Sequence, residues 1–187
     1  MRFVINILLF GLFIFNFGCA AQYLNPGQEP AQLNVTATSY IDPREVYNAL
    51  ELSIGAPDMY YLKFHGTVRG PWWSFKAYEV LNNGSYRPLK STNSNLFEGQ
   101  QGTILRGSRT FLIPQGQYPV EIWLEVYINY CESLRPMDCN TMTIKRWVKN
   151  VDQTSFSANE IINMQIQGDA IPDGTTGKEN VMKHVAP

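Results

Sequence analysis

The stretch "YPVEIWLEVYINY" at residues 118–130 alternates apolar and more polar side chains over ten successive positions. A period of two residues is that of a β-strand with one buried face. The stretch therefore predicts a long strand with an apolar core face and an amphipathic outer face. The residues expected on the core face are Val120, Ile122, Leu124, Val126 and Ile128.

A second alternating segment, "TMTIKRWV" at 141–148, follows after two cysteines. Cys131 and Cys139 have seven residues between them, which fits neither a CxxC redox motif nor a zinc site. We expect a β-hairpin whose long loop is closed by a Cys131–Cys139 disulfide. For a closed loop of about nine residues, the chain-entropy model gives about 2.5 kcal/mol of stabilisation. The residues expected on one side of the second strand are Met142, Ile144 and Val148.

Further short apolar and aromatic runs lie at 59–68, 72–81, 103–119 and 160–168, separated by glycine, proline and an Asn-Gly turn signal. Many short strands at such spacing predict a sandwich or a barrel. We expect an all-β fold, an Ig-like or transthyretin-like β-sandwich with a disulfide-closed hairpin loop. This analogy concerns the fold alone and carries no function.

One segment has helical signals. Asp42 is a good N-cap and Pro43 suits the first helical position, so residues 43–49 predict a short helix or turn. Leu50, Leu52 and Ile54 alternate, which predicts β-structure for the stretch that follows.

The N-terminus has the layout of a secretory signal, because Arg2 precedes an apolar run at residues 3–17. That run is shorter than the roughly 20 residues a membrane-spanning helix needs. At its end, Gly18 and Cys19 resemble the lipobox of bacterial lipoproteins, although Asn16 stands where that family usually has an aliphatic residue. The resemblance covers residues 1–19 alone. It implies a signal peptide at 1–18, a lipidated Cys19 and attachment to the periplasmic face of the bacterial outer membrane.

Two alternatives remain open for the N-terminus. Ordinary signal peptidase could cut after Ala20 or Ala21, which would give a soluble periplasmic or secreted protein. A eukaryotic secreted protein is the other, since Asn34-Val-Thr and Asn83-Gly-Ser fit the glycosylation acceptor pattern. In each case the loss or lipidation of Cys19 leaves an even pair of cysteines for an oxidising compartment.

Composition divides the rest of the chain. Residues 19–32 are rich in Pro, Gln and Gly and predict a flexible tether. Residues 33–167 are expected to form the sandwich domain. Residues 168–187, rich in Gly, Asp, Thr and Pro, predict a disordered tail.

Charge and motifs argue against several functions. Fifteen basic residues stand against sixteen acidic ones, so no net field favours nucleic acid. The two histidines, His65 and His184, leave little for nucleophilic catalysis, and no hydrolase, metalloprotease or nucleotide-binding motif occurs. Glu121 and Glu125 share one strand face and are expected to be its solvated side. We therefore expect no enzyme, no metal and no cofactor.

Aromatic residues are the best candidates for contact with a partner. In "GPWWSF" at 70–75, Trp72 and Trp73 point to opposite faces if the segment is a strand, so one is expected in the core and one outward. Trp123 and Tyr127 form a second pair on the polar side of the clearest strand. Exposed Trp and Tyr side chains anchor interfaces.

These features predict a lipid-anchored, non-catalytic structural or assembly component of a bacterial cell-envelope complex such as a secretion apparatus. The partners would be the membrane, through the lipid, and other envelope proteins. The alternative is a lipoprotein that binds a glycan, a peptide or a small ligand, or an inhibitor that presents the 131–139 loop.

Overall fold

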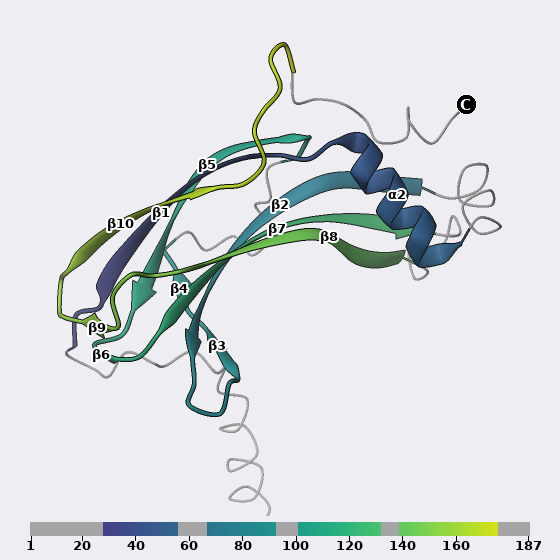
Figure 1. Ribbon diagram of the computed structural model, residues 1–187. Helices are drawn as coiled ribbons and strands as arrows, with labels where there is room; N and C mark the ends of the chain where they lie inside the picture. The colour runs from purple at the N-terminus through teal and green to yellow at the C-terminus, as the bar shows by residue number, and fades with distance from the viewer. Residues whose placement is uncertain (1–27, 56–66, 93–100, 132–138, 176–187) are drawn as a thin grey trace, which may run out of the picture.

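The computed structural model describes residues 28–55, 67–92, 101–131 and 139–175 (Figure 1). Within these ranges most residues lie in β-strands, and one helix is present. In chain order the elements are β1 (Ala31–Tyr40), α2 (Pro43–Ile54), β2 (Thr67–Val80), β3 (Tyr86–Pro88), β4 (Lys90–Ser91), β5 (Ile104–Ile113), β6 (Gly116–Gln117), β7 (Val120–Cys131), β8 (Cys139–Asn150), β9 (Ser155–Phe156) and β10 (Ile161–Gln167).

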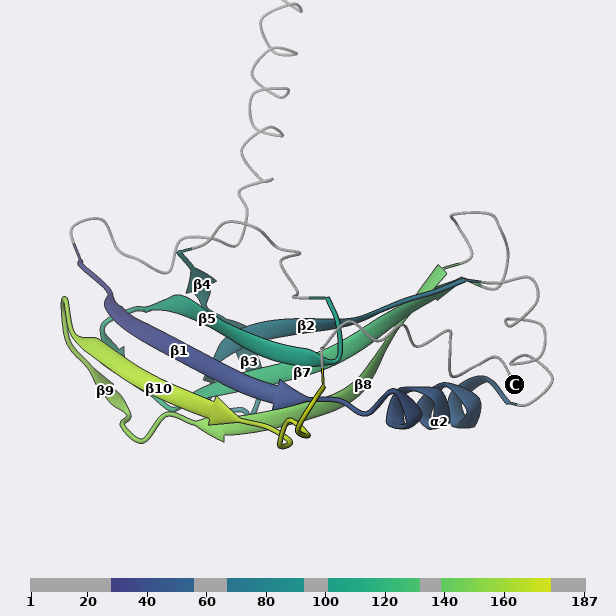
Figure 2. The ribbon, with the colours of Figure 1, turned by 90° about the horizontal axis from the view of Figure 1, so that it is seen from above.

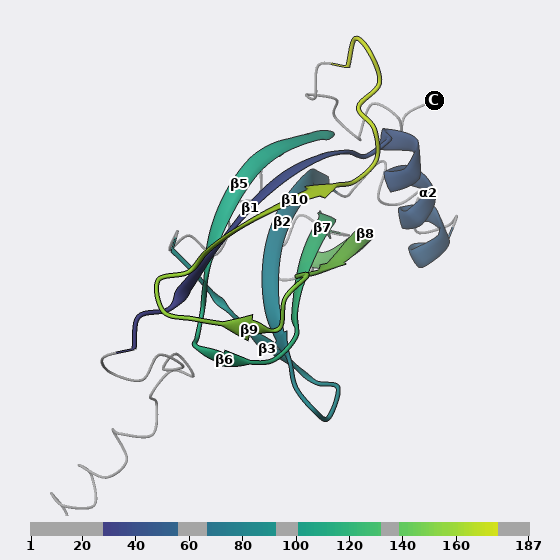
Figure 3. The same ribbon diagram turned by 60° about the vertical axis from the view of Figure 1, so that its left-hand side comes forward.

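The strands form two four-stranded sheets that lie face to face (Figures 2 and 3). The first sheet has the order β10-β1-β5-β4, and the second sheet has the order β3-β2-β7-β8. A small pair, β6-β9, lies at the end of the sandwich away from α2 (Figure 3). This arrangement confirms the predicted all-β sandwich.

β7 supplies the centre of the core, as its alternation predicts. Each of its five inward side chains is at most 1% exposed. They belong to one buried cluster with Leu33 and Val35 of β1 in the opposite sheet. Burying an aliphatic side chain of this size contributes about 1.5–3 kcal/mol, so contact between the two layers is the main source of stability.

β7 and β8 form the predicted antiparallel hairpin. Their register runs from Glu121 opposite Asn150 to Cys131 opposite Cys139. The two cysteines are joined by a disulfide, which confirms that prediction. Residues 132–138, within the loop that the disulfide closes, lie outside the described residues.

β8 departs from its predicted alternation because it contains a β-bulge. Val126 lies opposite Lys145 and Tyr127 lies opposite Thr143, so β8 has one residue more than β7 over this interval. A bulge shifts the alternation by one position. Trp147 therefore packs against the core, and Val148 is 52% exposed. The prediction that Val148 shares a side with Met142 and Ile144 is wrong for this reason.

β2 is one strand where the sequence predicts two. It continues through Gly70 and Pro71, which are joined by a cis peptide bond. The pairing with β7 shifts register between Arg69 and Trp72, so the expected break is an irregularity within a continuous strand. Most of the strand predicted at 59–68 lies outside the described residues.

α2 begins as predicted but is longer. The Asp42 side chain caps it by accepting a hydrogen bond from a backbone N–H two residues further on. The β-structure predicted for 50–54 is wrong, because the helix continues through this stretch. Val46 and Leu50 are both fully buried and lie four residues apart, which is helical spacing. Leu52 is 87% exposed and contributes nothing to the buried side.

The first and last strands of the domain are neighbours. β1 and β10 pair in parallel over seven residues, from Gln32 opposite Ile161 to Thr38 opposite Gln167. β1 also pairs with β5 in the antiparallel sense. β1 is therefore one of the two central strands of the first sheet, and β10, the last described strand, is one of its edges.

The domain boundaries differ slightly from those expected. β1 begins at Ala31, so residues 31 and 32 belong to the sandwich rather than to the predicted tether. At the other end, the Gly168 N–H donates to the Thr38 carbonyl at 2.9 Å, and Asp169 pairs with Lys145. The start of the predicted tail thus contacts the sandwich. Residues 1–27, including Cys19, lie outside the described residues, among which no helix is long and apolar enough to cross a bilayer.

Candidate functional site: the outer face of the second sheet

Three of the four candidate contact residues lie on one face of the second sheet. Trp72 of β2 is opposite Tyr127 of β7, and Lys76 is opposite Trp123. Neighbouring residues along a strand point to opposite faces, and Ile122 is buried in the core. Trp123, and with it these partners, therefore lies on the face turned away from the first sheet, which we call the outer face.

Trp73 is the exception. It is 0% exposed, and its indole Nε1 donates to the Gly102 carbonyl at 2.8 Å. Its ring stacks on that of Trp147, with centroids 5.8 Å apart. Trp73 is thus a core residue with a satisfied polar atom. The structure confirms that one of the two tryptophans is in the core, and it is Trp73, so of the possible contact residues Trp73 is not at the surface.

Trp123 is part of a group of three rings, Tyr78, Tyr86 and Trp123, which we call the aromatic cluster. The Trp123 centroid lies 4.5 Å from that of Tyr78 and 5.0 Å from that of Tyr86, and the two tyrosines are 5.8 Å apart. The rings are tilted or edge-on, which is the favourable arrangement for aromatic pairs. Each comes from a different strand, so the fold of the sheet assembles the cluster.

The cluster and its surroundings include exposed apolar surface. Among the described residues four large hydrophobic side chains are exposed; Tyr86, at 44%, is a member of the cluster, and Val148 lies next to it. Val148 is opposite Trp123 in the β7–β8 pair. The guanidinium of Arg146 lies 4.0 Å from the centroid of the Trp123 ring, where a cation is attracted by the π-face. This part of the outer face is apolar at its surface and carries an ordered cation.

Beside the cluster lies a buried carboxylate, which the sequence predicts as a solvated one. Glu125 is 2% exposed. Its Oε2 lies 2.5 Å from Lys76 Nζ, and its Oε1 accepts hydrogen bonds from the Arg146 guanidinium at 2.7 Å. We call Glu125, Lys76 and Arg146 the ion network. Glu125 is shielded from water because the long side chains of Lys76 and Arg146, on the neighbouring strands, cover it.

The electrostatics of the ion network favour the charged form of Glu125. Burial alone would raise the pKa of its carboxyl group. The hydrogen bonds and positive charges of Lys76 and Arg146 outweigh that effect and hold the pKa below its usual value of 4.5. Burial also raises the pKa of the nearby Tyr78 hydroxyl. At neutral pH the network therefore consists of one anion held between two cations.

Trp72 and Tyr127 lie further along the same outer face, and both are half-buried. The Trp72 Nε1 atom is buried and has no hydrogen-bond partner among the described residues. A buried indole N–H usually finds an acceptor, and this one has none among the described residues. Because the Trp72 side chain is half-buried, it presents less surface to a partner than its place on the outer face suggests.

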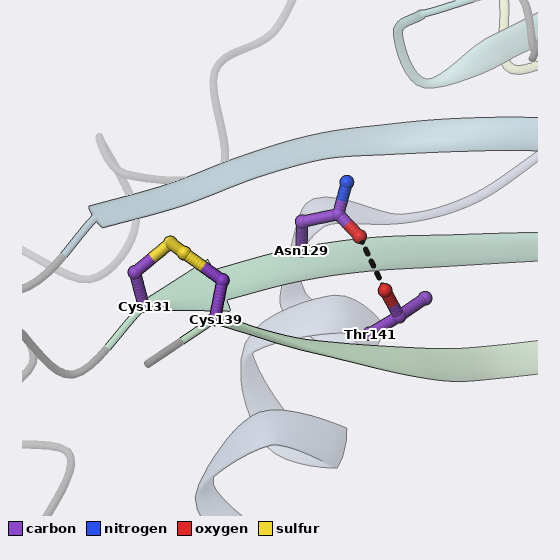
Figure 4. The surroundings of a disulfide bond; sticks show 4 residues. All are labelled: Asn129, Cys131, Cys139 and Thr141. Carbon is purple, nitrogen blue, oxygen red and sulfur yellow. Dashed lines mark hydrogen bonds between the residues drawn. A yellow bond between two sulfur atoms is a disulfide. The ribbon is translucent and has the colours of Figure 1, made fainter. Parts of the chain in front are cut away.

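The disulfide lies at the far end of the β7–β8 hairpin (Figure 4). Just inside it, the Thr141 hydroxyl donates to the Asn129 side-chain carbonyl at 2.8 Å across the same two strands. The covalent and the polar cross-strand contacts both fix the register of β7 and β8.

Both carboxylates of β7 form hydrogen bonds or ion pairs with other side chains of the protein. Glu121 accepts a hydrogen bond from Trp123 Nε1 at 3.0 Å, and Glu125 is held in the ion network. Across the ranges that the structure describes, no group of three or more metal-ligating side chains lies together. His65 and His184 lie outside those ranges.

The sequence contains a signal for part of the aromatic cluster. Along 72–81, the residues that share a face with Trp72 are Ser74, Lys76 and Tyr78, so a period of two already groups Lys76 and Tyr78 with the outer face. Tyr86 and Arg146 carry no such signal. Their places depend on the β2–β3 turn and on the bulge in β8.

Comparison of the chain with models of protein families, with curated proteins and with solved structures finds no match.

Proposed function

We propose that the protein is a lipid-anchored, non-catalytic component of a bacterial cell-envelope complex, of the kind that a secretion apparatus contains. It docks onto a partner protein through the aromatic cluster on the outer face of the second sheet. The observation that carries this proposal is the exposure of Tyr86 and Val148 on either side of Trp123.

The composition of the cluster suits a protein interface. Tyr, Trp and Arg are the residues most enriched at binding hot spots. Here Arg146 is held over Trp123 by its contact with Glu125. A side chain ordered before binding loses less conformational entropy when the partner arrives. The ion network thus supports docking by fixing the cation that borders the apolar surface.

The anchor is supported by Gly18 and Cys19 and by the position of the first strand. β1 begins at Ala31, which leaves the eleven residues 20–30 between Cys19 and the first strand as a tether. A chain of that length reaches at most about 40 Å when fully extended. An acylated Cys19 would keep the sandwich close to the membrane, where envelope partners are concentrated.

Docking is tested with Tyr86→Ala, with Leu52→Ala as the matched control. Leu52 is the more exposed of the two, at 87%, and lies on α2, outside the second sheet. We expect Tyr86→Ala to weaken recovery of the native complex from detergent-solubilised membranes by about 30-fold, the equivalent of about 2 kcal/mol. The thermal midpoint of both variants should stay close to that of the wild type. Equal recovery of both variants would overturn the docking face.

The anchor is tested separately with Cys19→Ser. We expect this variant to leave the membrane fraction or to remain unprocessed, as shown by fractionation and by mass spectrometry of the N-terminus. A correctly processed Cys19→Ser protein that stays in the membrane would reject the lipid anchor. Purification of a monomer that retains a sugar or a small ligand would instead support the alternative of a ligand-binding lipoprotein.

A further inference from the structure

A second surface, distinct from the aromatic cluster, lies at the edge of the first sheet. β10 is the outermost strand of that sheet, and its sole neighbour among the described strands is β1 (Figure 2). The Thr36 hydroxyl of β1 donates to the Met164 carbonyl, whereas Lys149 of β8 donates to the Gln165 carbonyl at 2.9 Å. Successive backbone groups of β10 therefore point alternately toward β1 and away from it. The N–H and C=O groups of Asn163 and Gln165 face outward.

The other sheet edges have features that block a further strand. β3 and β4 are three and two residues long, and a very short edge offers few hydrogen bonds. β8 carries Lys145, Arg146 and Lys149, and charged side chains protect an edge. β10 has seven residues, "IINMQIQ", without a charge or a proline. By its length and its own side chains, it is the least protected edge in the described part of the chain.

The chemistry of this edge selects an extended chain. Outward-facing backbone groups at alternate positions match the backbone of another β-strand, and addition of a strand to an exposed edge is a general mode of peptide recognition. The side chain of Lys149 reaches this edge from the second sheet. Lys149 is opposite Ile122, a core residue, so the Lys149 side chain points from the second sheet toward the first. The ammonium group therefore lies on the side of β10 that faces the second sheet.

Lys149 also indicates which charge a partner strand should carry. Lys145, four residues earlier on the same strand, is paired with Glu45 and Asp169. Lys149 forms no ion pair with any carboxylate of the described residues, and its ammonium group donates to the Gln165 carbonyl. In an added strand every second side chain points toward the second sheet. A carboxylate at such a position would meet an unpaired ammonium group.

The same lysine disfavours a second copy of this chain. Two β10 strands paired about a two-fold axis would bring two Lys149 ammonium groups to one edge, and like charges placed close together are destabilising. The β10 strand itself offers no carboxylate to either lysine.

We propose that β10 accepts an extended, acidic segment of a partner protein as an additional strand of the first sheet. The segment hydrogen-bonds to the outward backbone of Asn163 and Gln165, and one of its carboxylates pairs with Lys149 in place of the Gln165 carbonyl. This site is independent of the aromatic cluster, which lies on the other sheet.

The test uses the full chain, immobilised in mild detergent, and a displayed library of random decapeptides. We expect the selected peptides to alternate β-branched or aromatic residues with others, to lack proline in the middle, and to contain an acidic residue. Gln165→Pro should weaken a synthetic selected peptide by about tenfold or more, because it removes an outward N–H at an edge position where proline is tolerated. Gln165→Val, which keeps the N–H, should bind like the wild type.

Two further measurements sharpen the result. Lys149→Glu should change the selected charge from acidic to basic. Amide exchange at Asn163 and Gln165 should slow on binding, while exchange at Met164, already paired to β1, should not. Because Lys149→Glu leaves the backbone of β10 intact, it decides the question even if Gln165→Pro fails to fold.

Three outcomes would overturn the proposal: no peptide enrichment, equal affinity for Gln165→Pro and Gln165→Val, or an unchanged acidic preference in Lys149→Glu. A stable dimer that Gln165→Pro dissociates, seen by light scattering, would also reject it, since the occupant would then be a second copy. The Tyr86→Ala experiment is unaffected by any of these results.

Discussion

Removing both cations of the ion network should leave an uncompensated charge inside the protein. In the variant Lys76→Met/Arg146→Met, the Glu125 carboxylate stays buried at about its present 2% exposure and loses contacts of 2.5 and 2.7 Å. Breaking a fully buried ion pair in this way costs about 3–5 kcal/mol. Because the Lys76 and Arg146 side chains are 48% and 43% exposed, water weakens their attraction for Glu125, and we expect a smaller loss of about 2–3 kcal/mol. Methionine retains an apolar stem of similar reach, so the loss reports the charge more than the packing.

The loss should depend on pH in a defined direction. In the wild type, Lys76 and Arg146 hold the pKa of Glu125 below 4.5, so their stabilising effect is present above pH 4.5 and is lost as the pH falls through the lowered pKa. In the variant the cations no longer outweigh burial, which raises the pKa of Glu125, so the variant loses stability as the pH rises through that raised pKa. The gap between the two proteins is therefore largest at neutral pH and shrinks toward pH 4.5.

The assay is chemical denaturation followed by circular dichroism, at neutral pH and again near pH 5. Adding Glu125→Leu to the double variant is the control, because replacing a whole buried ion network with apolar residues is often neutral or stabilising. That triple variant should recover most of the lost stability. A double variant within about 1 kcal/mol of the wild type at neutral pH, or an equal loss at both pH values, would refute the reasoning.

Two other predictions concern the stability of the sandwich. Cys131→Ser/Cys139→Ser should lower the free energy of unfolding by about 2.5 kcal/mol, because the unfolded chain is no longer closed into a loop; an unchanged denaturation midpoint would contradict this. Ser39→Ala should leave the free energy of unfolding unchanged or raise it by about 1 kcal/mol, because the Ser39 hydroxyl is 0% exposed and has no hydrogen-bond partner among the described residues. A loss of more than about 1 kcal/mol on thermal denaturation would show that the hydroxyl is satisfied.

The sequence predicts best what depends on local alternation. β7 follows a strict period of two because one of its faces lies in the core along its whole length, so its burial can be read from the order of residues. The disulfide follows for a related reason, since two adjacent strands bring Cys131 and Cys139 opposite each other. Both depend on neighbours in the chain.

The incorrect predictions concern residues whose placement depends on pairing or packing with another part of the chain. Nothing in "TMTIKRWV" indicates the bulge that turns Trp147 inward and Val148 outward, because the bulge is defined by pairing with β7. Leu50 alternates with Leu52 as in a strand, yet its contact with the core through α2 prevails. Glu125 resembles a solvated glutamate because its two cations come from β2 and β8, distant in sequence.

The parallel pairing of β1 and β10 has a mechanical consequence. In a parallel pair, the start of one strand and the end of the other lie at opposite ends of the ladder, so tension applied between Ala31 and Gln167 is directed along the strands. The seven paired positions must then slide past one another together, whereas an antiparallel hairpin pulled from its open end separates one bond at a time. A load between an anchor at the N-terminal side and a partner at the C-terminal side would act on this ladder in shear, the direction in which hydrogen bonds share the force.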